Sequence, residues 1–486
     1  MNMETRPCTG SFFRDRWIRP VLSRITGSWI RRDAPVTAAA VAGLLTGLSA
    51  SPVWAADGGP ISPSNRRPNI LFILGDDMGY GTLSCNGSES CKTPNLDKLA
   101  ENGVRFTNAH AMPICTPTRV QLMTGQYNFR NYKRFAELSA GETTFANLLR
   151  DAGYTTCIAG KWQLGGNHES IGKFGFDRYC LWNFMGRGET QYWGAEIWED
   201  GKKRDDIAER YGPDIHVDYL LKFLDAQTQD KPFLAYWTTP LPHEPYSQTP
   251  DSADAPKPGD PRPALPGRGK SGSYGDPKYF PEMLAYLDKL VGTVVQKLED
   301  RGLRENTLIV FLGDNGTGYQ VEVKANGSVV TAGKAQTTIH GTHVPMIANW
   351  PAGGIKGKVC EDLIDTTDFL PTFLEAAGVN PPAKPVLDGR SFLPQICGRP
   401  GQPRDWAFFH YIKGPDKPVV EWILDQRWKL YSTGEFFDYR ADPKEKKPIS
   451  GNGAGAAERA KLQAVLDRMK AEGGGVEKKD KKENTK

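Results

Sequence analysis

The chain lacks a charge excess of either sign. It has 61 lysines and arginines against 57 aspartates and glutamates, and much of the small positive excess lies at the two termini. The body of the protein is therefore near neutral, which excludes the basic footprint of a protein that binds nucleic acid or anionic membranes. Hydrophobic residues at 39% and charged residues at 24% are typical of a soluble globular enzyme or binding protein.

Long apolar stretches are also lacking, except near the N-terminus. There an arginine-rich segment precedes an apolar run at 34–49, followed by Val53-Trp54-Ala55. This order predicts a signal peptide, residues 1–55, with small side chains at the cleavage site. A membrane anchor is the alternative, but the run is short and Thr, Gly and Ser interrupt it. We expect a periplasmic or extracellular protein with no stable membrane span after signal cleavage.

Cysteine is scarce as well, with 8 residues in the whole chain. Removal of the leader takes Cys8 away, and if Cys115 is reserved for chemistry an even number remains. An even number can pair in an oxidising compartment, and Cys85 with Cys91 across a short loop is the easiest pair. The alternative is that most of these cysteines are small buried hydrophobic residues.

Short apolar runs alternate with helical patterns along the chain. The runs of strand length are at 69–74, 154–159, 233–237, 307–312 and 345–349, and the helical patterns between them are at 95–102, 144–152, 214–227 and 281–301. Runs that are apolar on both faces favour a parallel sheet covered by helices. The sequence therefore predicts an α/β fold with a mostly parallel central sheet flanked by helices.

Composition divides the chain further. A linker at 56–66 leads into a predicted catalytic domain at 67–395, within which the Pro- and Gly-rich residues 250–275 form a long surface loop. Shorter β-like runs and a helix then predict a small C-terminal α+β domain at 396–472, with a short antiparallel sheet plus a helix. The Gly- and Lys-rich tail at 473–486 is predicted to be disordered.

Polar residues follow several of the predicted strands. Asp76 and Asp77 follow the first strand, and Asp314 and Asn315 follow another in nearly the same phrase. Ligands bind outside the carboxyl ends of strands in open α/β sheets, so these groups can converge on one site. Three carboxylates repel one another there unless a cation is present, and an all-oxygen set selects Ca²⁺ or Mg²⁺ over zinc. A turn or helix cap is the alternative for Asp76-Asp77 alone.

The sharpest motif is Cys115-Thr-Pro117-Thr-Arg119. Pro117 fits the first turn of a helix, which places Cys115 at the helix N-terminus, where free amides and the helix dipole favour an anion. Arg119, one turn later, can steady the same group. The residues alone leave open whether Cys115 is a nucleophile or a buried structural thiol.

Several motifs, in order along the chain, resemble those of type I sulfatases, which are formylglycine-dependent, arylsulfatase-like enzymes of the alkaline phosphatase superfamily. Cys-x-Pro-x-Arg followed by Leu122, Thr124 and Gly125 is similar to the motif whose cysteine becomes formylglycine in that family. The resemblance covers about residues 66–443, and further matching motifs stand at 66–81, 160–165, 242–245, 313–316, 333–334, 368–372, 387–390 and 428–430.

The resemblance implies a calcium-dependent sulfatase that hydrolyses a sulfate ester. It implies that Cys115 becomes 3-oxoalanine (formylglycine) through a formylglycine-generating enzyme. It also implies Ca²⁺, with Mg²⁺ less favoured, bound by Asp76, Asp77, Asp314 and Asn315. The groups around the sulfate would be Arg119, Lys161, His243 and Lys334.

Chemical logic supports an aldehyde at this position. A serine sulfate would be a dead-end ester, whereas an aldehyde hydrate has two hydroxyl groups. One hydroxyl attacks sulfur while the metal and lysines absorb charge, and deprotonation of the other expels sulfate by C–O cleavage. Asp314 is the predicted base for the attacking hydroxyl, and His243 is the predicted acid for the departing alcohol.

The chain departs from the family pattern at several positions. Position 118 is Thr where the family usually has Ser, and position 163 is Gln where it usually has His. Gln163 can hydrogen-bond to substrate but cannot take a proton near neutral pH. His340 and His343 replace residues of another family motif, and they either face the substrate or are ordinary packing histidines.

Two other functions compete with a sulfatase. A phosphate or phosphonate monoester hydrolase of the same superfamily is one, but the typical two-zinc phosphatases need more histidines and a Ser or Thr nucleophile. A non-catalytic carbohydrate-binding relative is the other, and the retained Cys115, Arg119 and metal ligands argue against it. A sulfated saccharide is the preferred substrate over a small aryl ester. An aromatic cluster either stacks on a sugar or belongs to the core, and its members are Tyr179, Trp182, Phe184, Tyr192, Trp193 and Trp198.

Overall fold

The computed structural model describes residues 66–182, 184, 191–257, 259–260, 275–414, 417–450, 453 and 455–473. The predicted signal peptide, nearly all of the predicted linker, residues 474–486 of the tail and residues 261–274 of the long loop lie outside these residues. The described residues all belong to one compact unit, Trp54–Lys486. None of the helices in this described part is long and apolar enough to cross a bilayer.

An 11-stranded sheet lies at the centre, in the order β12-β2-β11-β8-β1-β7-β3-β4-β5-β6, with β13 paired to β2. Neighbours from β8 through β1, β7 and β3 to β4 run parallel, which confirms the predicted mostly parallel sheet. The strands are β1 (Asn69–Gly75), β2 (Val104–His110), β3 (Thr155–Lys161), β4 (Arg178–Trp182), β5 (Trp198–Glu199), β6 (Lys202–Lys203), β7 (Phe233–Thr238), β8 (Thr307–Gly313), β11 (His343–Asn349), β12 (Lys358–Cys360) and β13 (Ile364–Asp365).

One strand direction differs from the simplest expectation. The apolar run at 345–349 lies in β11, but β11 is antiparallel to both β8 and β2. Burial on both faces, which makes a strand uniformly apolar, does not depend on direction, so the run itself carries no signal of orientation. Strand β2 was not among the predicted strands, which were identified by continuous apolar runs; its sequence, VRFTNAH, contains no such run.

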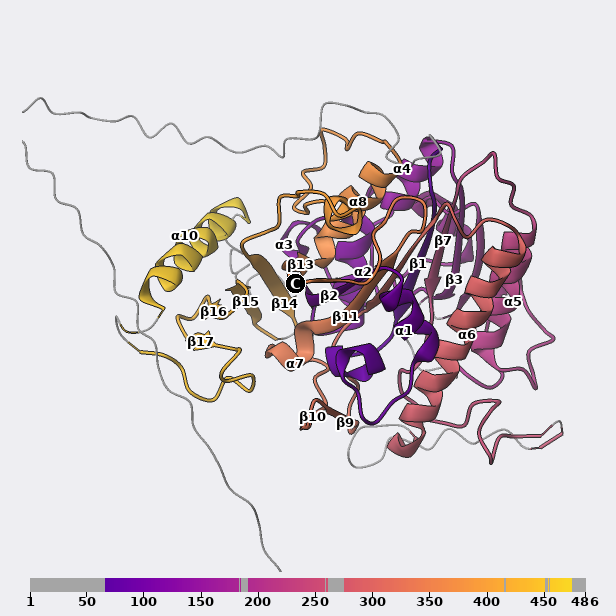
Figure 1. Ribbon diagram of the computed structural model, residues 1–486, viewed down its shortest axis with the longest axis horizontal. Coiled ribbons are helices and arrows are strands. Elements are labelled where there is room, and N and C mark those ends of the chain that lie inside the picture. The colour runs from indigo at the N-terminus through magenta and orange to yellow at the C-terminus, as the bar shows by residue number, and fades with distance from the viewer. Residues whose placement is uncertain are drawn as a thin grey trace, which may run out of the picture. The chain divides into compact units, whose positions relative to one another are not determined.

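Helices cover both faces of the sheet (Figure 1). The side chains of Ile70, Phe72 and Leu74 pack with helices α2, α4 and α8, whereas Leu71 and Ile73 pack with α1, α5 and α6 on the opposite face. Alternate residues of one strand thus enter two cores, as the period of two requires. The helices are α1 (Pro94–Glu101), α2 (Cys115–Thr124), α3 (Asn128–Asn131), α4 (Phe145–Asp151), α5 (Gly212–Asp225), α6 (Phe280–Asp300), α7 (Ile339–Thr342), α8 (Phe369–Ala376) and α9 (Leu393–Ile396). Short 3₁₀ turns stand at η1 (Tyr80–Thr82), η2 (Ser84–Asn86), η3 (His168–Phe174), η4 (Pro277–Tyr279) and η5 (Thr366–Asp368).

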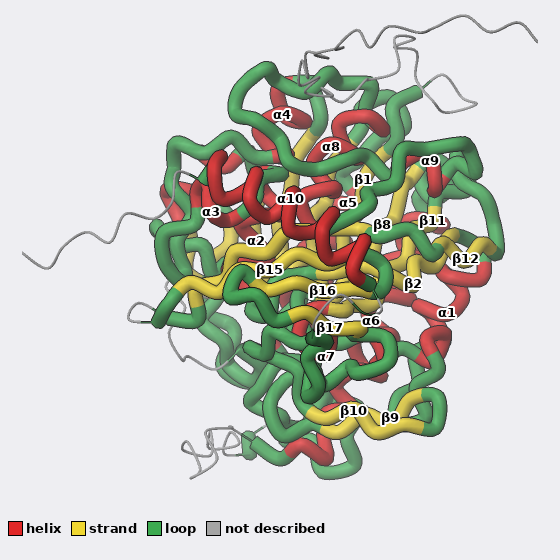
Figure 2. The backbone as a smooth tube through the Cα atoms, turned by 90° about the vertical axis from the view of Figure 1, so that its left-hand side faces the viewer, coloured by secondary structure: helices red, strands yellow, loops and turns green. Residues whose placement is uncertain are grey.

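A second, four-stranded antiparallel sheet follows near the C-terminus, as predicted. It consists of β14 (Ala407–Ile412), β15 (Val419–Leu424), β16 (Trp428–Tyr431) and β17 (Phe436–Asp438). Helix α10 (Ala456–Glu472) packs on one face through Leu462 and Leu466 (Figure 2). The other face packs against Met112, Ile114 and Ala335. Its contacts therefore reach the chain that immediately precedes Cys115. A separate hairpin is formed by β9 (Glu322–Ala325) and β10 (Ser328–Thr331).

The cysteines of the described residues are all free thiols, and five of the seven are buried. The Cys85–Cys91 pair considered from the sequence is therefore not formed. Burial of most of the thiols agrees with the alternative, in which these residues serve as small hydrophobic side chains.

Candidate active site at the carboxyl ends of the strands

The tips of two neighbouring strands bring four of the predicted residues together. Asp76 and Asp77 follow β1, and Asp314 and Asn315 follow β8, with Gly75 and Gly313 directly paired in the parallel register. All four side chains are buried. The backbone N–H of Asp77 donates to Asp314 Oδ1 at 3.0 Å, and Asn315 Nδ2 donates to Asp77 Oδ1 at 2.8 Å. The parallel pairing of β1 and β8 thus aligns Asp76-Asp77 with Asp314-Asn315.

Cys115 lies beside these strand tips. It is the first residue of α2 and is 2% exposed. Its Sγ and one carboxylate oxygen each from Asp76 and Asp314 lie within 4.8 Å of one another. The Thr118 hydroxyl donates to the backbone carbonyl of Asp314 at 2.8 Å and so ties the first turn of α2 to the end of β8. Thr at position 118 keeps the hydroxyl that the family's Ser would provide.

Three cationic side chains meet the three carboxylates. Lys161 Nζ, at the end of β3, lies 2.6 Å from Asp76 Oδ2, and Lys334 Nζ lies 2.7 Å from Asp77 Oδ2. In the third pair, Arg119 Nη2 lies 3.2 Å from Asp314 Oδ2. These side-chain cations thus offset part of the repulsion among the three carboxylates. From the sequence alone, that repulsion was the reason to predict a metal ion. Paired charges are the usual condition for burying ionised groups.

The carboxyl groups differ in their affinity for protons. Burial would raise the pKa of Asp76, but the positive charges of Lys161, His243 and Arg119 hold it well below its usual range. Burial raises the pKa of Asp314, and the negative charge of Asp76 raises it further, against the opposing effect of Arg119. The site therefore pairs a firmly ionised carboxylate with one that holds a proton more readily.

Two buried oxygens of the cluster have no hydrogen-bond partner among the described residues, namely Asp76 Oδ1 and Asn315 Oδ1. Each is an acceptor with free lone pairs, and each stands beside a further carboxylate. Buried oxygens of this kind cost free energy unless a donor or a cation satisfies them. A hard divalent cation fits this donor set, because Ca²⁺ takes carboxylate and amide oxygens.

His243 stands at the outer side of the cluster. Its Nε2 lies 2.8 Å from Lys334 Nζ, which donates to it, and its side chain is 17% exposed. Burial lowers the pKa of His243 to about 4, and the positive charge of Lys334 adds to this effect. The Tyr192 hydroxyl donates to the His243 carbonyl, and Gln191 Nε2 donates to the carbonyl of Glu244 at 2.8 Å. These two supports could not be predicted from the sequence, because Gln191 and Tyr192 are distant from His243 along the chain and belong to no motif.

Gln163 is held in the left-handed region, with φ of +51°, two residues after Lys161. Its side chain is 5% exposed, and its Oε1 has no hydrogen-bond partner among the described residues. The amide thus keeps an acceptor available for a donor that arrives with substrate or water. It has no second ionisable state with which to take a proton.

His340 and His343 lie apart from this hydrogen-bond network. His343 Nε2 is 2.9 Å from the carbonyl of Thr107, and its ring stacks on Tyr80 with 4.0 Å between centroids. The His340 side chain, on α7, is half-buried. Neither ring has a hydrogen bond to the carboxylate–lysine cluster within the described residues. For His343 this placement favours the packing alternative.

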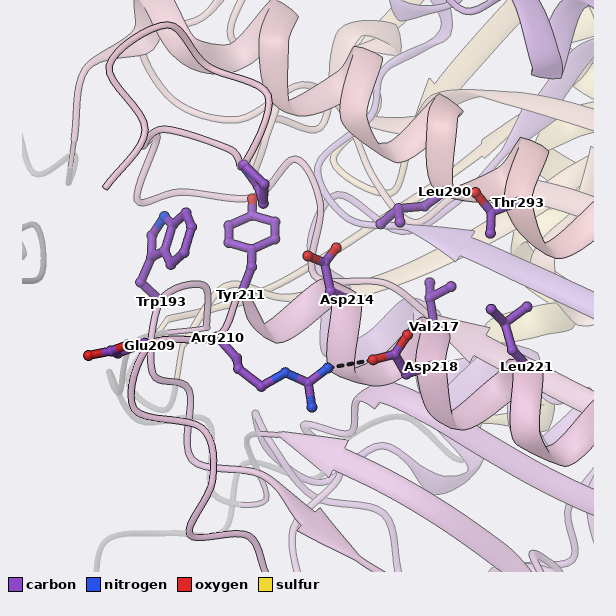
Figure 3. Close-up of a pocket in the computed structure, with 11 residues that line it drawn as sticks. Trp193, Glu209, Arg210, Tyr211, Asp214, Val217, Asp218, Leu221, Leu290 and Thr293 are labelled. Carbon is purple, nitrogen blue, oxygen red and sulfur yellow. Dashed lines mark hydrogen bonds and ion pairs between the residues drawn. The ribbon is translucent and has the colours of Figure 1, made fainter. Parts of the chain in front are cut away.

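A cavity of about 440 Å³ lies elsewhere, between α5, α6 and the segment around residues 193–211 (Figure 3). It is lined by three carboxylates, Glu209, Asp214 and Asp218, and by Arg210, which pairs with Asp218. None of the predicted catalytic, substrate-binding or metal-binding residues lines it, although Trp193 of the aromatic cluster does. An acidic cavity repels an anion such as a sulfate ester, so the strand-tip cluster is the candidate active site.

Comparison with known proteins agrees with this placement. The family model described as Sulfatase matches residues 68–379, and the model described as N-sulphoglucosamine sulphohydrolase, C-terminal, matches residues 338–472. The N-acetylgalactosamine-6-sulfatase of Canis lupus familiaris is 32% identical over 78% of this chain and 74% of its own length. Arylsulfatase A of Homo sapiens is 31% identical over 72% of each chain. The N-acetylglucosamine-6-O-sulfatase of Bacteroides thetaiotaomicron is 25% identical over 84% of this chain and 87% of its own.

Solved structures share the fold. BT4656, in complex with its substrate D-glucosamine-2-N,6-O-disulfate, superposes with a TM-score of 0.69 at 23% identity, covering 85% of this chain and 100% of that one. The phosphonate monoester hydrolase of Agrobacterium radiobacter superposes with a TM-score of 0.62 at 22% identity, covering 84% and 96%. These likenesses show the fold alone, whereas the sequence matches show the family. The chain therefore belongs to the sulfatase family, and it is an enzyme that hydrolyses sulfate esters.

Proposed function

We propose that the protein hydrolyses sulfate esters of saccharides through Cys115, converted to formylglycine, and one bound Ca²⁺. The observation that carries the proposal is the approach of Cys115 Sγ to the oxygens of Asp76 and Asp314 within 4.8 Å. A saccharide is favoured because two of the relatives are named as N-acetylhexosamine-6-sulfatases.

The metal ligands in this proposal are Asp76, Asp77, Asp314 and Asn315. Support comes from the two unpartnered buried oxygens, Asp76 Oδ1 and Asn315 Oδ1. Ca²⁺ is preferred over Mg²⁺, since Mg²⁺ demands near-ideal octahedral geometry and usually keeps several waters. When bound, the ion acts as a Lewis acid toward the sulfate oxygens.

An unmodified thiol suits this position poorly. Burial raises the pKa of the Cys115 thiol, with a partly opposing effect from Lys161. A thiol with a raised pKa is protonated at neutral pH and is a weak nucleophile. Formylglycine supplies two hydroxyl groups on one carbon when hydrated, which serve attack on sulfur and release of sulfate in turn.

The remaining residues have distinct tasks in this proposal. The ammonium groups of Lys161 and Lys334 and the guanidinium of Arg119 bind the sulfate and stabilise negative charge that develops on it. Asp314 accepts a proton at residue 115, because its carboxylate is within reach of that side chain. His243 accepts a hydrogen bond from the Lys334 ammonium, and in this proposal it relays the proton of that ammonium to the departing alcohol on the open side of the site.

Processing is part of the proposal. Cys115 is 2% exposed in the folded protein, so a formylglycine-generating enzyme must act before the chain has folded. We also propose that residues 1–55 are a signal peptide that directs export, and that residues 67–395 and 396–472 are the catalytic and small C-terminal domains. Residues Gln163, His340 and His343 stay candidates for substrate contact.

A phosphate or phosphonate ester is the second candidate substrate, since the fold is shared with a phosphonate monoester hydrolase. Rates on an aryl sulfate and an aryl phosphate, together with the mass of the tryptic peptide that carries residue 115, test both ideas. We expect an aldehyde at residue 115 and faster turnover of the sulfate. Cys115→Ala is expected to abolish turnover with an unchanged thermal unfolding midpoint. Faster turnover of the phosphate would favour the second candidate, and an unmodified thiol without turnover would favour a carbohydrate-binding protein.

A further inference from the structure

The burial of the cluster locates the mouth of the site. The carboxylates of Asp76, Asp77 and Asp314 are fully buried, whereas the side chains of Lys334 and His243 keep 9% and 17% of their exposure. A substrate therefore reaches the cluster from the side of Lys334 and His243. The part of the ester that remains after sulfate has entered extends outward past these two residues.

An exposed aromatic ring stands at this mouth. Among the described residues only two aromatic side chains are exposed, Phe135 at 43% and Tyr319 at 38%. The Tyr319 ring centroid lies 5.7 Å from Lys334 Nζ. A single exposed ring is not unusual by itself, but this one adjoins a side chain of the active site.

The backbone of Tyr319 is held in place. The Tyr246 hydroxyl donates to the Tyr319 carbonyl at 3.1 Å, and Tyr246 itself is buried. The preceding residue is Gly318, where a Cβ would lie 2.3 Å from the Tyr246 hydroxyl and 3.1 Å from Asp77 Oδ2. Only glycine permits so close an approach, which brings the Tyr319 segment against a residue of the catalytic cluster. The Tyr319 ring thus projects from a backbone segment that the Tyr246 hydrogen bond and the close packing at Gly318 hold in place.

Most of the aromatic cluster, which the sequence left open as either a sugar-stacking surface or part of the core, is engaged elsewhere in the protein. Tyr179, Trp182 and Tyr192 are buried at 8%, 3% and 1% exposure. The Trp198 ring stacks on His168. These rings are largely engaged within the protein, so they offer less free face to a sugar than Tyr319 does.

We propose that Tyr319 is a stacking platform for the pyranose ring of the sulfated sugar and so determines specificity for cyclic saccharide esters. The proposal rests on the saccharide sulfatase function proposed above. The face of a pyranose presents C–H groups, which pack on an aromatic face, while the negative sulfate is drawn to Lys334 beside the same ring. An acyclic alkyl sulfate offers no such flat face.

The test compares Tyr319→Ala and Tyr319→Phe with the wild-type holoenzyme on N-acetylgalactosamine 6-sulfate, N-acetylglucosamine 6-sulfate and hexyl sulfate. For whichever of the two sugar sulfates the wild type hydrolyses, Tyr319→Ala is expected to raise KM about tenfold with little change in kcat. Its KM for hexyl sulfate should stay near the wild-type value, and Tyr319→Phe should behave as wild type. Val329→Ala, which changes a 52% exposed side chain on the β9–β10 hairpin, is the matched control.

Binding provides a readout that needs no turnover. Calorimetry with the same sugar esters compares Cys115→Ala with Cys115→Ala/Tyr319→Ala, and the double variant should bind about tenfold more weakly. Equal affinities, or an equal loss for sugar and hexyl esters, would overturn the platform. Absence of wild-type turnover on every sulfate ester would instead contradict the proposed function, and the binding comparison would still decide the role of Tyr319.

Discussion

Calcium removal should lower the thermal unfolding midpoint of the protein, because the ion binds the native site and not the unfolded chain. The ion would satisfy Asp76 Oδ1 and Asn315 Oδ1, which have no partner among the described residues. A ligand at 100 times its Kd stabilises the native state by about 2.7 kcal/mol. For a folded body of roughly 400 residues the unfolding entropy is about 0.8 kcal/mol/K, so the unfolding midpoint should rise by about 3 °C.

The assay is thermal unfolding of the wild type in EGTA and in increasing Ca²⁺. Asp76→Asn should lose the calcium-dependent shift, because it removes a charge from the predicted ligand set. Asp251→Asn is the control, since Asp251 pairs with Lys289 at the surface and is 52% exposed. The same wild-type midpoint with EGTA and with Ca²⁺, or an undiminished shift in Asp76→Asn, would refute the reasoning.

Three further substitutions test other features. Gln163→His should leave kcat on sulfated saccharides unchanged or raise it, since it adds a group that can take a proton; a large loss would show that Gln163 has a required role of its own. Burial lowers the pKa of His216 to about 3, and neither ring nitrogen has a partner among the described residues. The unfolded chain therefore takes up a proton first as the pH falls below about 6.5, and stability drops by about 1.4 kcal/mol per pH unit. Urea unfolding of His216→Leu at pH 7 and pH 5 should show a smaller drop than the wild type, and an equal drop would contradict this. Lys429→Met should lower the unfolding free energy by about 3 kcal/mol, because it leaves Glu445 buried without its cation, and Lys429→Met/Glu445→Gln should regain part of the loss. A single variant as stable as the wild type in urea would argue against that pair.

Much of the architecture was available from local patterns. The apolar run at 69–74 became β1, and the helical pattern at 281–301 became α6, because burial on both faces and a 3.6-residue period each leave a strong mark on the sequence. The C-terminal runs likewise became β14, β15 and β16. The direction of a strand leaves no such pattern in the sequence. The antiparallel orientation of β11 is therefore known only from its pairing with β8 and β2.

The sequence by itself also determined the chemical inventory of the site. Cys115, Asp76 and Asp314 stand in short motifs whose residue types are tied to their chemistry. Tertiary structure decided how those residues meet: Lys161 and Lys334 are separated by much of the chain, yet each pairs with an aspartate of the same cluster.

Exposure was decided by the fold alone. The sequence does not distinguish an aromatic residue of the core from one at the surface. Only the packing of the folded chain places Tyr192 inside and Tyr319 at the mouth of the active site. The supports of His243 follow the same rule, since Tyr192 reaches its carbonyl across the fold rather than along the chain. Local chemistry is written in neighbouring residues, whereas burial and long-range hydrogen bonds depend on which segments the folded chain brings together.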